Sequence, residues 1–332
     1  MKKNIVKKIR TQIFSHLYFH SNGDCRNTVF VAGTGRSGTT WISNILNHKN
    51  GYRYIFEPFY PQNVPMCRNF KYRQYLRPMD HRSDYLYPAE CVVTGKFRNA
   101  WTDRYNVSFF SSKRLIKDIR ANLLLKWLKN HFPEIKIVLV LRHPCAVACS
   151  KLKLGWGSHL ELLLSQYQLM NDYLEPFRSE IVTAETSFEK HIFLWCIENY
   201  VPLQQFKRAE IHLVFYEHFC HNPEREIQRL FRFLGMPFKE EVLAHLHFPS
   251  VVSHKDSAII SGESLIDSWR KDITMEQVRR AEEILYLFGL DTIYTKVSMP
   301  NVDSQEGYHR ADQPTCMPQD KSAENTDLLT EY

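Results

Sequence analysis

The sequence predicts a single doubly wound α/β domain, in which a parallel sheet carries helices on both faces. Strand and helix patterns alternate along the chain, which is the order of parallel strands joined by crossover helices. Residues 136–141 form a near-continuous apolar run, of the kind buried on both faces of such a sheet. The first strand pattern, residues 28–32, leads through a glycine-rich turn into a helix pattern at residues 40–48.

The remaining elements follow from local signals. Further strands are predicted at residues 52–56, 91–94, 114–117 and 211–216, and helices at 121–131, from 144, and at 186–206, 224–234 and 274–288. Pro58 ends the second strand because proline cannot donate to a sheet ladder. Pro144 suits a first helical position, and Gly235 and Gly289 suit helix ends.

Three segments flank or interrupt this pattern. Residues 58–112, rich in Tyr, Arg and Pro, read as an irregular insertion, and such loops often carry binding residues. Residues 1–27 form a basic extension, and residues 296–332 are polar without periodicity and are predicted to be disordered. The domain itself is therefore expected at residues 28–295, as one core.

The charge of the chain favours an anionic ligand. The net charge is +7, and because residues 1–27 carry +5 and residues 301–332 carry −5, the body also holds +7. A basic body suits nucleotides, phosphates or polyanionic sugars, although ordinary surface charge is an equal alternative. No nucleic-acid partner is predicted.

Cysteine usage and hydropathy suggest a cytoplasmic protein. The eight cysteines form no CxxC pair, no metal site is predicted, and Cys145 and Cys149 are expected to be buried thiols. No run approaches the roughly 18 apolar residues that a membrane span needs. Ile5, Ile9 and Ile13 could line a basic amphipathic helix that touches anionic lipid, or that packs against the domain.

The turn after the first strand has the spacing of a phosphate-binding loop. Gly33-x4-Gly38-Thr39-Thr40 places glycines where backbone N–H groups can close around phosphate oxygens at the start of a helix. Thr39 stands where nucleotide triphosphatases have a lysine, which argues against Mg-ATP chemistry. Arg36 supplies a cation within the loop instead.

Arg-Ser-Gly-Thr-Thr-Trp after a strand resembles the 5′-phosphosulfate loop of the sulfotransferase family, over roughly residues 28–295. The resemblance implies that the donor is 3′-phosphoadenosine 5′-phosphosulfate (PAPS), with no metal required. It implies donor contacts from Gly35, Arg36, Ser37, Gly38, Thr39, Thr40 and Trp41. Arginine at position 36 is typical of carbohydrate sulfotransferases, whereas small-molecule members usually have lysine.

A second motif follows the strand at residues 136–141. Arg142 at the strand end and Ser150 on the next helix can converge on one anion, and they resemble the family's 3′-phosphate site. Tyr216 begins a Tyr-Glu-His segment similar to the family's Tyr-Glu-Asp, which implies an adenine contact, with a core tyrosine as the alternative. Lys255 and Arg270 are further 3′-phosphate candidates that no motif supports.

The base that deprotonates the acceptor is not the histidine of small-molecule members, because Lys117-Asp118-Ile119 replaces their Lys-Thr-His. Glu57, in a Glu-Pro pair after the second strand, resembles the carboxylate base of glycan-type enzymes, and Lys117 matches the lysine near the transferring group. Asp118 is the second candidate for the base. A structural role for Glu57, such as a salt bridge to Arg36, stays open, and His143 is expected to face the loop without a role.

The acceptor is predicted to be a hydroxyl on a sugar, glycolipid or other glycan. A hydroxyl or amine of a small metabolite or toxin is the alternative, and a phosphate-loop kinase or a non-catalytic nucleotide binder are rival functions. The basic and aromatic residues of the insertion could hold an anionic saccharide or form a solvated face: Arg68, Arg73, Arg77, Lys96, Arg98 and Trp101.

Overall fold

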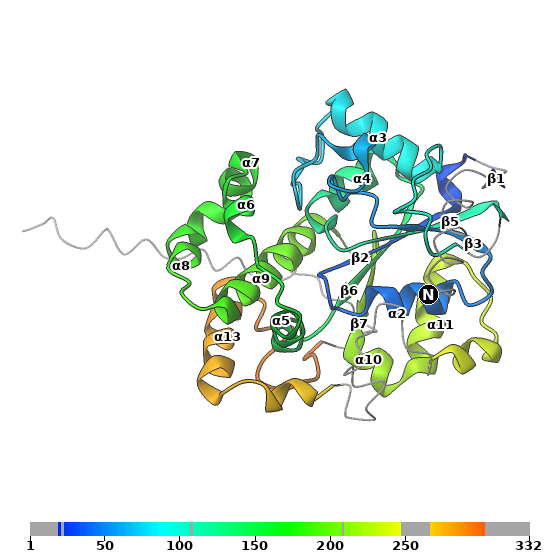
Figure 1. Cartoon of the computed structure of the whole chain (residues 1–332). Helices are drawn as coiled ribbons and strands as arrows, with labels where there is room; N and C mark the ends of the chain where they lie inside the picture. The colour runs from blue at the N-terminus through cyan, green and yellow to red at the C-terminus, as the bar shows by residue number, and fades with distance from the viewer. Residues whose placement is uncertain (1–18, 21–22, 107–108, 208, 247–265, 303–332) are drawn as a thin grey trace, which may run out of the picture.

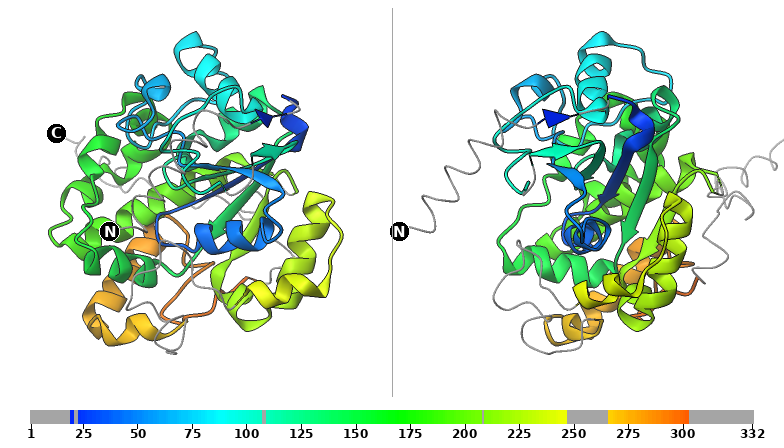
Figure 2. Two further views of the ribbon diagram at one scale, coloured as in Figure 1. Left: turned by 45° about the vertical axis from the view of Figure 1, so that its right-hand side comes forward. Right: turned by 90° about the vertical axis from the view of Figure 1, so that its right-hand side faces the viewer.

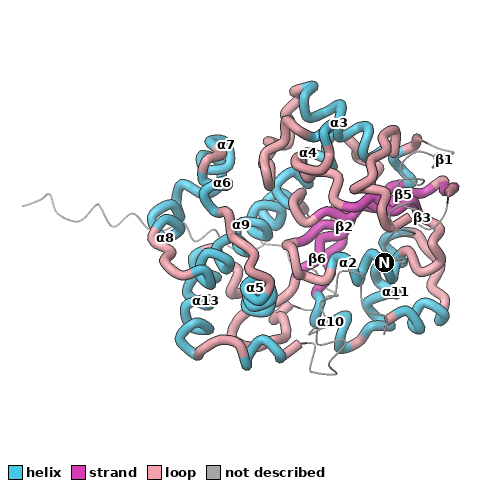
Figure 3. Tube along the Cα trace, in the orientation of Figure 1, coloured by secondary structure: helices cyan, strands magenta, loops and turns pink. Residues whose placement is uncertain are grey.

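The computed structural model describes residues 19–20, 23–106, 109–207, 209–246 and 266–302. A five-stranded parallel sheet runs through its centre with helices on both faces, so the predicted fold class is confirmed (Figures 1 and 3). The amphipathic pattern expected at the N-terminus, the candidate Lys255 and most of the expected polar tail lie outside the described residues.

The main sheet has the strand order β3-β5-β2-β6-β7, with every neighbouring pair parallel. Its strands are β2 (Thr28–Gly33), β3 (Tyr52–Phe56), β5 (Lys113–Asp118), β6 (Lys136–Leu141) and β7 (His212–Phe215). Each lies at or within one or two residues of its predicted position. A separate two-stranded pair joins β1 (Phe19–His20) to β4 (Phe110–Ser111).

The helices are α2 (Thr39–Leu46), α3 (Ser83–Thr94), α4 (Leu125–His131), α5 (Pro144–Lys153), α6 (Leu160–Leu164), α7 (Tyr167–Leu169), α8 (Arg178–Val182), α9 (Ser187–Gln205), α10 (Tyr216–His221), α11 (Pro223–Leu234) and α13 (Met275–Leu287). Some of their ends carry capping residues. Thr186 and Glu189 form a capping box that starts α9, and Gly235, at φ 69°, ends α11.

Alternate side chains of the strands enter two separate cores. Phe30 of β2 belongs to the core that contains residues of α4, α5, α9 and α13, whereas Val31 belongs to the core that contains residues of α2 and α11. Figure 2 shows these helices on opposite sides of the sheet. Every residue of β2 is buried, as expected for the central strand of a doubly wound sheet.

The strand predicted at residues 91–94 is wrong, because these residues form the last turn of α3. The β-branched Val92, Val93 and Thr94 favour a strand locally. In the structure Val92 and Val93 are buried in the core, and the Thr94 hydroxyl donates to the Glu90 carbonyl oxygen one helical turn earlier (2.6 Å). Tertiary burial thus overrides local propensity.

Residues 160–182 contain three helices, α6, α7 and α8, that the sequence patterns did not predict. Each has only three to five residues, which is too short for a 3.6-residue periodicity to show. The helix predicted at residues 121–131 also begins as a 3₁₀ turn at Asn122–Leu124 before α4.

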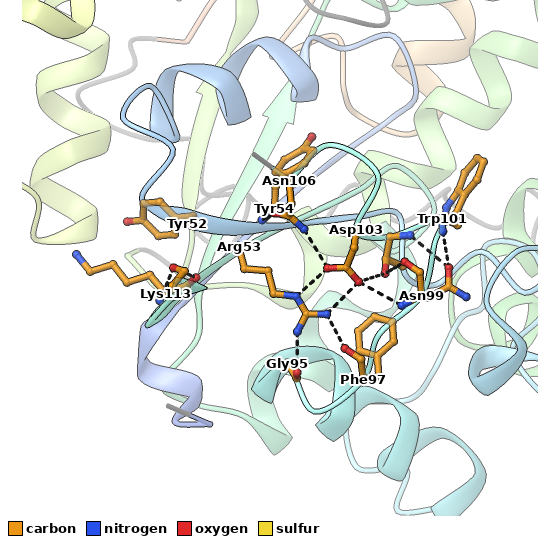
Figure 4. Close-up of polar contacts among 12 residues, drawn as sticks. Tyr52, Arg53, Tyr54, Gly95, Phe97, Asn99, Trp101, Asp103, Asn106 and Lys113 are labelled. Atoms are coloured by element: carbon orange, nitrogen blue, oxygen red, sulfur yellow. Dashed lines mark hydrogen bonds and ion pairs between the residues drawn. The ribbon is translucent and has the colours of Figure 1, made fainter. Parts of the chain in front are cut away.

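A buried ion pair ties the insertion to β3 (Figure 4). The guanidinium of Arg53 donates to both carboxylate oxygens of Asp103 (2.8 and 3.1 Å) and to the carbonyl oxygens of Gly95 and Phe97. Asn106 donates to Asp103 and accepts from the Tyr54 N–H. These contacts fix residues 95–106 beside the strand that ends at the candidate site.

Candidate active site

The predicted site residues lie together at the carboxyl edge of the sheet. The phosphate-type loop follows β2, Glu57 follows β3, Lys117 is near the end of β5, Arg142 follows β6 and Tyr216 follows β7. The chain runs from β2 outward to β3 and β5 and then crosses to β6 on the other side of β2. The loop therefore lies at the topological switch point, where open α/β sheets bind ligands.

The loop is shaped by its glycines and by one strained residue. A Cβ on Gly38 (φ 97°) would lie 2.6 Å from the Tyr216 ring, so only glycine fits there. Arg36 has φ 77°, a left-handed conformation that costs a non-glycine residue about 1–3 kcal/mol and that is typical of functional sites. The chain then enters α2 at Thr39, followed by Thr40 and Trp41.

The structure brings the two predicted phosphate motifs into contact. The Arg36 Nε donates to the Ser150 hydroxyl (3.0 Å), and the Arg142 Nη1 donates to the Arg36 carbonyl oxygen (3.2 Å). Burial and the nearby positive charge of Arg142 lower the pKa of Arg36. Within the described residues no carboxylate forms an ion pair with Arg36, so a bound anion would relieve this repulsion.

The hydroxyl of Ser37 is a second feature of the loop that suits an anion. Its oxygen is buried and has no hydrogen-bond partner among the described residues. A buried polar group without a partner is costly and calls for an explanation. Together with the backbone N–H groups at the start of α2, this hydroxyl fits a phosphate or sulfate oxygen of a donor.

Tyr216 is buried beneath the loop. Its ring lies 4.4 Å from the Arg142 guanidinium carbon and 5.4 Å, edge to face, from the Trp41 ring. The Trp41 indole N–H in turn donates to the Leu246 carbonyl oxygen. The aromatic pair therefore supports Arg142 and the loop from below, and the adenine contact of Tyr216 stays a prediction.

Glu57 is the centre of a buried charge cluster. Lys117 Nζ contacts Glu57 Oε1 (2.7 Å) and Arg120 Nη1 contacts Oε2 (2.5 Å), whereas Arg36 takes no part in these two contacts. Burial would raise the pKa of the Glu57 carboxyl, but Lys117 and Arg120 outweigh it and hold that pKa below its ordinary value. Glu57 also has a strained backbone, with φ 45°.

Asp118, the second candidate for the base, accepts hydrogen bonds from backbone donors. Its carboxylate accepts from the N–H groups of Phe59 (2.9 Å) and Arg120 (2.7 Å), and its side chain is fully buried. Burial, followed by the nearby charge of Glu57, raises the pKa of Asp118 to about 6. This geometry matches a residue that holds the turn after β5.

Arg120 is a site residue that sequence reasoning missed. It lies three residues after Lys117 in no recognised motif, and only its place just beyond a strand end hinted at a role. Trp101 of the insertion also contacts the site, which the sequence did not indicate. Its indole N–H donates to the Glu57 carbonyl oxygen (3.3 Å). Both contacts depend on chain segments that meet only in the fold.

The expectation that His143 faces the loop is wrong. Its ring stacks on Trp269 at 4.5 Å between ring centres, and its Nε2 lies 2.8 Å from the Thr295 carbonyl oxygen. Burial lowers the pKa of His143 to about 4. Arg270 packs its guanidinium over Trp269 and donates to the Lys296 carbonyl oxygen, so it also belongs to this C-terminal packing.

The fold and the site define a phosphate-loop α/β protein with a second cationic group beside the loop. The sequence matches the family described as "Sulfotransferase domain" over residues 26–286, and the chain belongs to that family.

The chain is also similar to several named proteins. The chain is 22% identical to the nodulation protein NoeE of Sinorhizobium fredii over 282 residues, which cover 77% of this chain and 63% of NoeE. It is 25% identical to sulfotransferase 1B1 of Canis lupus familiaris over 252 residues, or 73% and 70% of the two chains. A solved sulfotransferase domain of the Synechococcus olefin synthase aligns with a TM-score of 0.44 and 18% identity, over 78% of this chain and 95% of that one.

Two further observations concern membranes and metals. No helix among the described residues is both long and apolar enough to cross a bilayer. The same residues contain no group of three or more His, Cys, Asp and Glu side chains arranged to hold a metal ion.

Proposed function

We propose that this protein transfers a sulfuryl group from PAPS to an acceptor hydroxyl, on a sugar, glycolipid or other glycan. Family membership over residues 26–286 supports the class of reaction. The observation that carries the proposal is the contact between Arg36, Ser150 and Arg142, which joins two anion-binding motifs more than 100 residues apart. A donor with phosphate groups at both its 3′ and 5′ positions needs such a double site.

The residues present fit this donor. The backbone and hydroxyl groups of Gly35 to Trp41, with Arg36, would hold the 5′-phosphosulfate, and Arg142 with Ser150 would hold the 3′-phosphate. The buried, unpartnered Ser37 hydroxyl is one group that the donor would satisfy. When bound, PAPS supplies an activated sulfuryl group, and the cations at the strand ends stabilise charge on its oxygens.

Glu57 is proposed as the base. Glu57 is ionised at neutral pH, so its carboxylate can accept the proton of an acceptor hydroxyl. Lys117 and Arg120 fix both carboxylate oxygens, and Lys117 lies where a cation can also reach the transferring group. Loss of a positioned base costs about two to four orders of magnitude in rate.

We further propose that the sulfotransferase domain spans residues 28–295 and that the enzyme works in the cytoplasm. Seven cysteines within the described residues are free thiols, and Cys145 and Cys149 are buried as expected. Free thiols are typical of a reducing compartment. The alternative acceptor is a small-molecule hydroxyl or amine, and the transfer assay below distinguishes it from a glycan.

Titration calorimetry tests the donor site. The purified chain should bind adenosine 3′,5′-bisphosphate without magnesium, and should bind Mg-ATP far more weakly because Thr39 replaces the lysine of nucleotide triphosphatases. The opposite preference would indicate a kinase.

A transfer assay then tests catalysis. Wild-type protein is incubated with ³⁵S-labelled PAPS and cell extract, and the labelled product is identified by mass. A labelled glycan supports the proposal, and a labelled metabolite or amine supports the alternative acceptor. Tight donor binding with no labelled product would indicate a non-catalytic binder.

A further inference from the structure

A cavity of about 540 Å³ lies between the first part of the insertion and α6. From the insertion its wall includes Arg68, Phe70, Lys71 and Tyr72, and from the α6 side it includes Leu162 and Ser165. No acidic side chain lines it among the described residues. The cavity therefore presents two cations and two hydroxyl groups beside aromatic and aliphatic side chains, which is a lining suited to an anionic ligand that also has a less polar face.

Arg68 and Lys71 differ from most other cations of the insertion. Arg73 pairs with Glu198, Arg77 with Asp172 and Lys96 with Glu90. Arg68 and Lys71 are exposed, and within the described part of the chain neither forms an ion pair with a carboxylate. The charges of these two residues are thus available to a ligand in the cavity.

Aromatic rings connect the cavity to the candidate base. The Arg120 guanidinium, which contacts Glu57, lies 3.9 Å from the centre of the Tyr60 ring and 5.2 Å from that of Tyr72. The Tyr60 and Tyr72 rings are 6.2 Å apart, and Tyr72 forms part of the cavity wall. A ligand that contacts Tyr72 is therefore separated from the Arg120–Glu57 pair only by the Tyr72 side chain.

Buried contacts hold this wall in place. Arg73 has φ 56° and turns its side chain inward to Glu198 (2.5 Å), while the preceding Tyr72 lines the cavity. Gln166 accepts from the Tyr75 N–H and donates to the Arg73 carbonyl oxygen, which joins the insertion to the segment after α6. The cavity wall is thus built on a buried ion pair, and such support preorganises a site.

We infer that this cavity binds the acceptor, and that the acceptor is an acidic saccharide whose carboxylate or sulfate groups contact Arg68 and Lys71. This inference rests on the proposed sulfuryl transfer and names its substrate class. Tyr72, whose ring also contacts the Arg73 and Arg120 guanidiniums, forms the side of the cavity nearest that pair, so the hydroxyl to be modified lies toward Glu57.

The experiment uses an extract divided on an anion exchanger at neutral pH into an unbound pool and a bound, anionic pool. Each pool is incubated with ³⁵S-labelled PAPS and one of three proteins: wild type, Arg68→Ala/Lys71→Ala, or the matched control Arg178→Ala/Arg279→Ala. The control removes two exposed cations elsewhere, on α8 and α13. Adenosine 3′,5′-bisphosphate binding is measured for each protein.

We expect the label to enter the anionic pool, and mild periodate, which cleaves vicinal diols of sugars, to destroy the acceptor. The double variant should need about tenfold more of that pool for half-maximal rate, with little change in maximal rate and unchanged bisphosphate binding, because it loses two charged contacts to the acceptor. The control should match wild type.

Three results would overturn the inference while leaving the proposed function standing. They are label only in the unbound pool, an unchanged half-saturating amount for the double variant, or an acceptor that resists periodate. Absence of label from both pools would overturn the inference and the proposed transfer together. Bisphosphate binding then shows whether the donor site itself is wrong.

Discussion

Two buried arginine clusters, around Arg53 and around Arg36, differ in how their charge is balanced. Arg53 is fully buried, and Asp103 and two carbonyl oxygens surround its guanidinium. Arg36 is also largely buried, but its neighbours are a serine hydroxyl and the like charge of Arg142. The first cluster is complete within the chain, whereas the second gains stability from an added anion.

This difference separates a structural ion pair from a binding site. A buried charge with a matched partner holds two segments together, and removing that partner leaves an uncompensated charge. A buried cation beside another cation, at a strained backbone position, has a cost that the fold alone does not repay. Both clusters are buried and positively charged, so these two properties do not distinguish them. They differ in the partner of the arginine, which is a carboxylate for Arg53 but not for Arg36.

Glu57 follows β3, the strand that carries Arg53, and its substitution has the largest expected effect. Glu57→Gln should lower turnover by about two to four orders of magnitude, because the amide cannot accept the acceptor's proton. The affinity for adenosine 3′,5′-bisphosphate, measured by calorimetry, should change little. Near wild-type turnover in the sulfate-transfer assay would reject Glu57 as the base. The matched variant Asp118→Asn should reduce turnover less.

Breaking the structural cluster should damage stability and spare the donor site. Asp103→Asn should lower the free energy of unfolding by about 3–5 kcal/mol, because the Arg53 charge stays buried without its carboxylate. Chemical denaturation measures this change, and bisphosphate affinity of the folded variant should match wild type. Glu90 forms an exposed ion pair with Lys96, so Glu90→Gln is the control. Its free energy of unfolding should match that of wild type. Equal stability of both variants would refute a structural role for Asp103.

At the donor loop we expect the opposite result, which is weaker bisphosphate binding without a loss of stability. Arg36→Ala should weaken bisphosphate binding about 10- to 150-fold, the range for loss of a hydrogen bond to a charged group. Its free energy of unfolding should not fall, since the change removes repulsion from Arg142. Arg36→Lys, which keeps the charge, should retain much of the affinity. A large loss of stability in Arg36→Ala would place Arg36 with the structural cluster.

The smallest effect concerns pH. The pKa of His143 in the folded protein is about 4, below its ordinary value of 6.5, because burial disfavours the charged ring. Its contribution to stability is therefore present above pH 6.5 and is lost as the pH falls toward 4. The slope is up to about 1.4 kcal/mol per pH unit. His143→Phe should make the free energy of unfolding less dependent on pH in this window, and an unchanged slope would contradict the buried placement.

The elements with strong local patterns were predictable. The apolar run of β6, Pro144 at the start of α5 and Gly235 at the end of α11 were recognisable from neighbouring residues alone. The end of α3 was not predictable, because its β-branched residues favour a strand locally. Burial of these residues in the core makes them helical instead. The loop, Arg142, Ser150 and Glu57 were candidates from sequence because each has a recognisable spacing from a strand, and the structure places them at one edge of the sheet. Arg120 follows a strand without any such spacing and was missed.

The sequence by itself determined the alternation of strands and helices, the missing phosphate-loop lysine at Thr39, and the family to which the loop belongs. These features depend on residues close together in the chain, whose propensities and spacing act locally. Only the tertiary structure decided that Glu57 pairs with Lys117 and Arg120, that His143 turns into the core, and that Arg36 meets Ser150. Such contacts join segments up to about 150 residues apart, and packing of the whole sheet and its helices selects them.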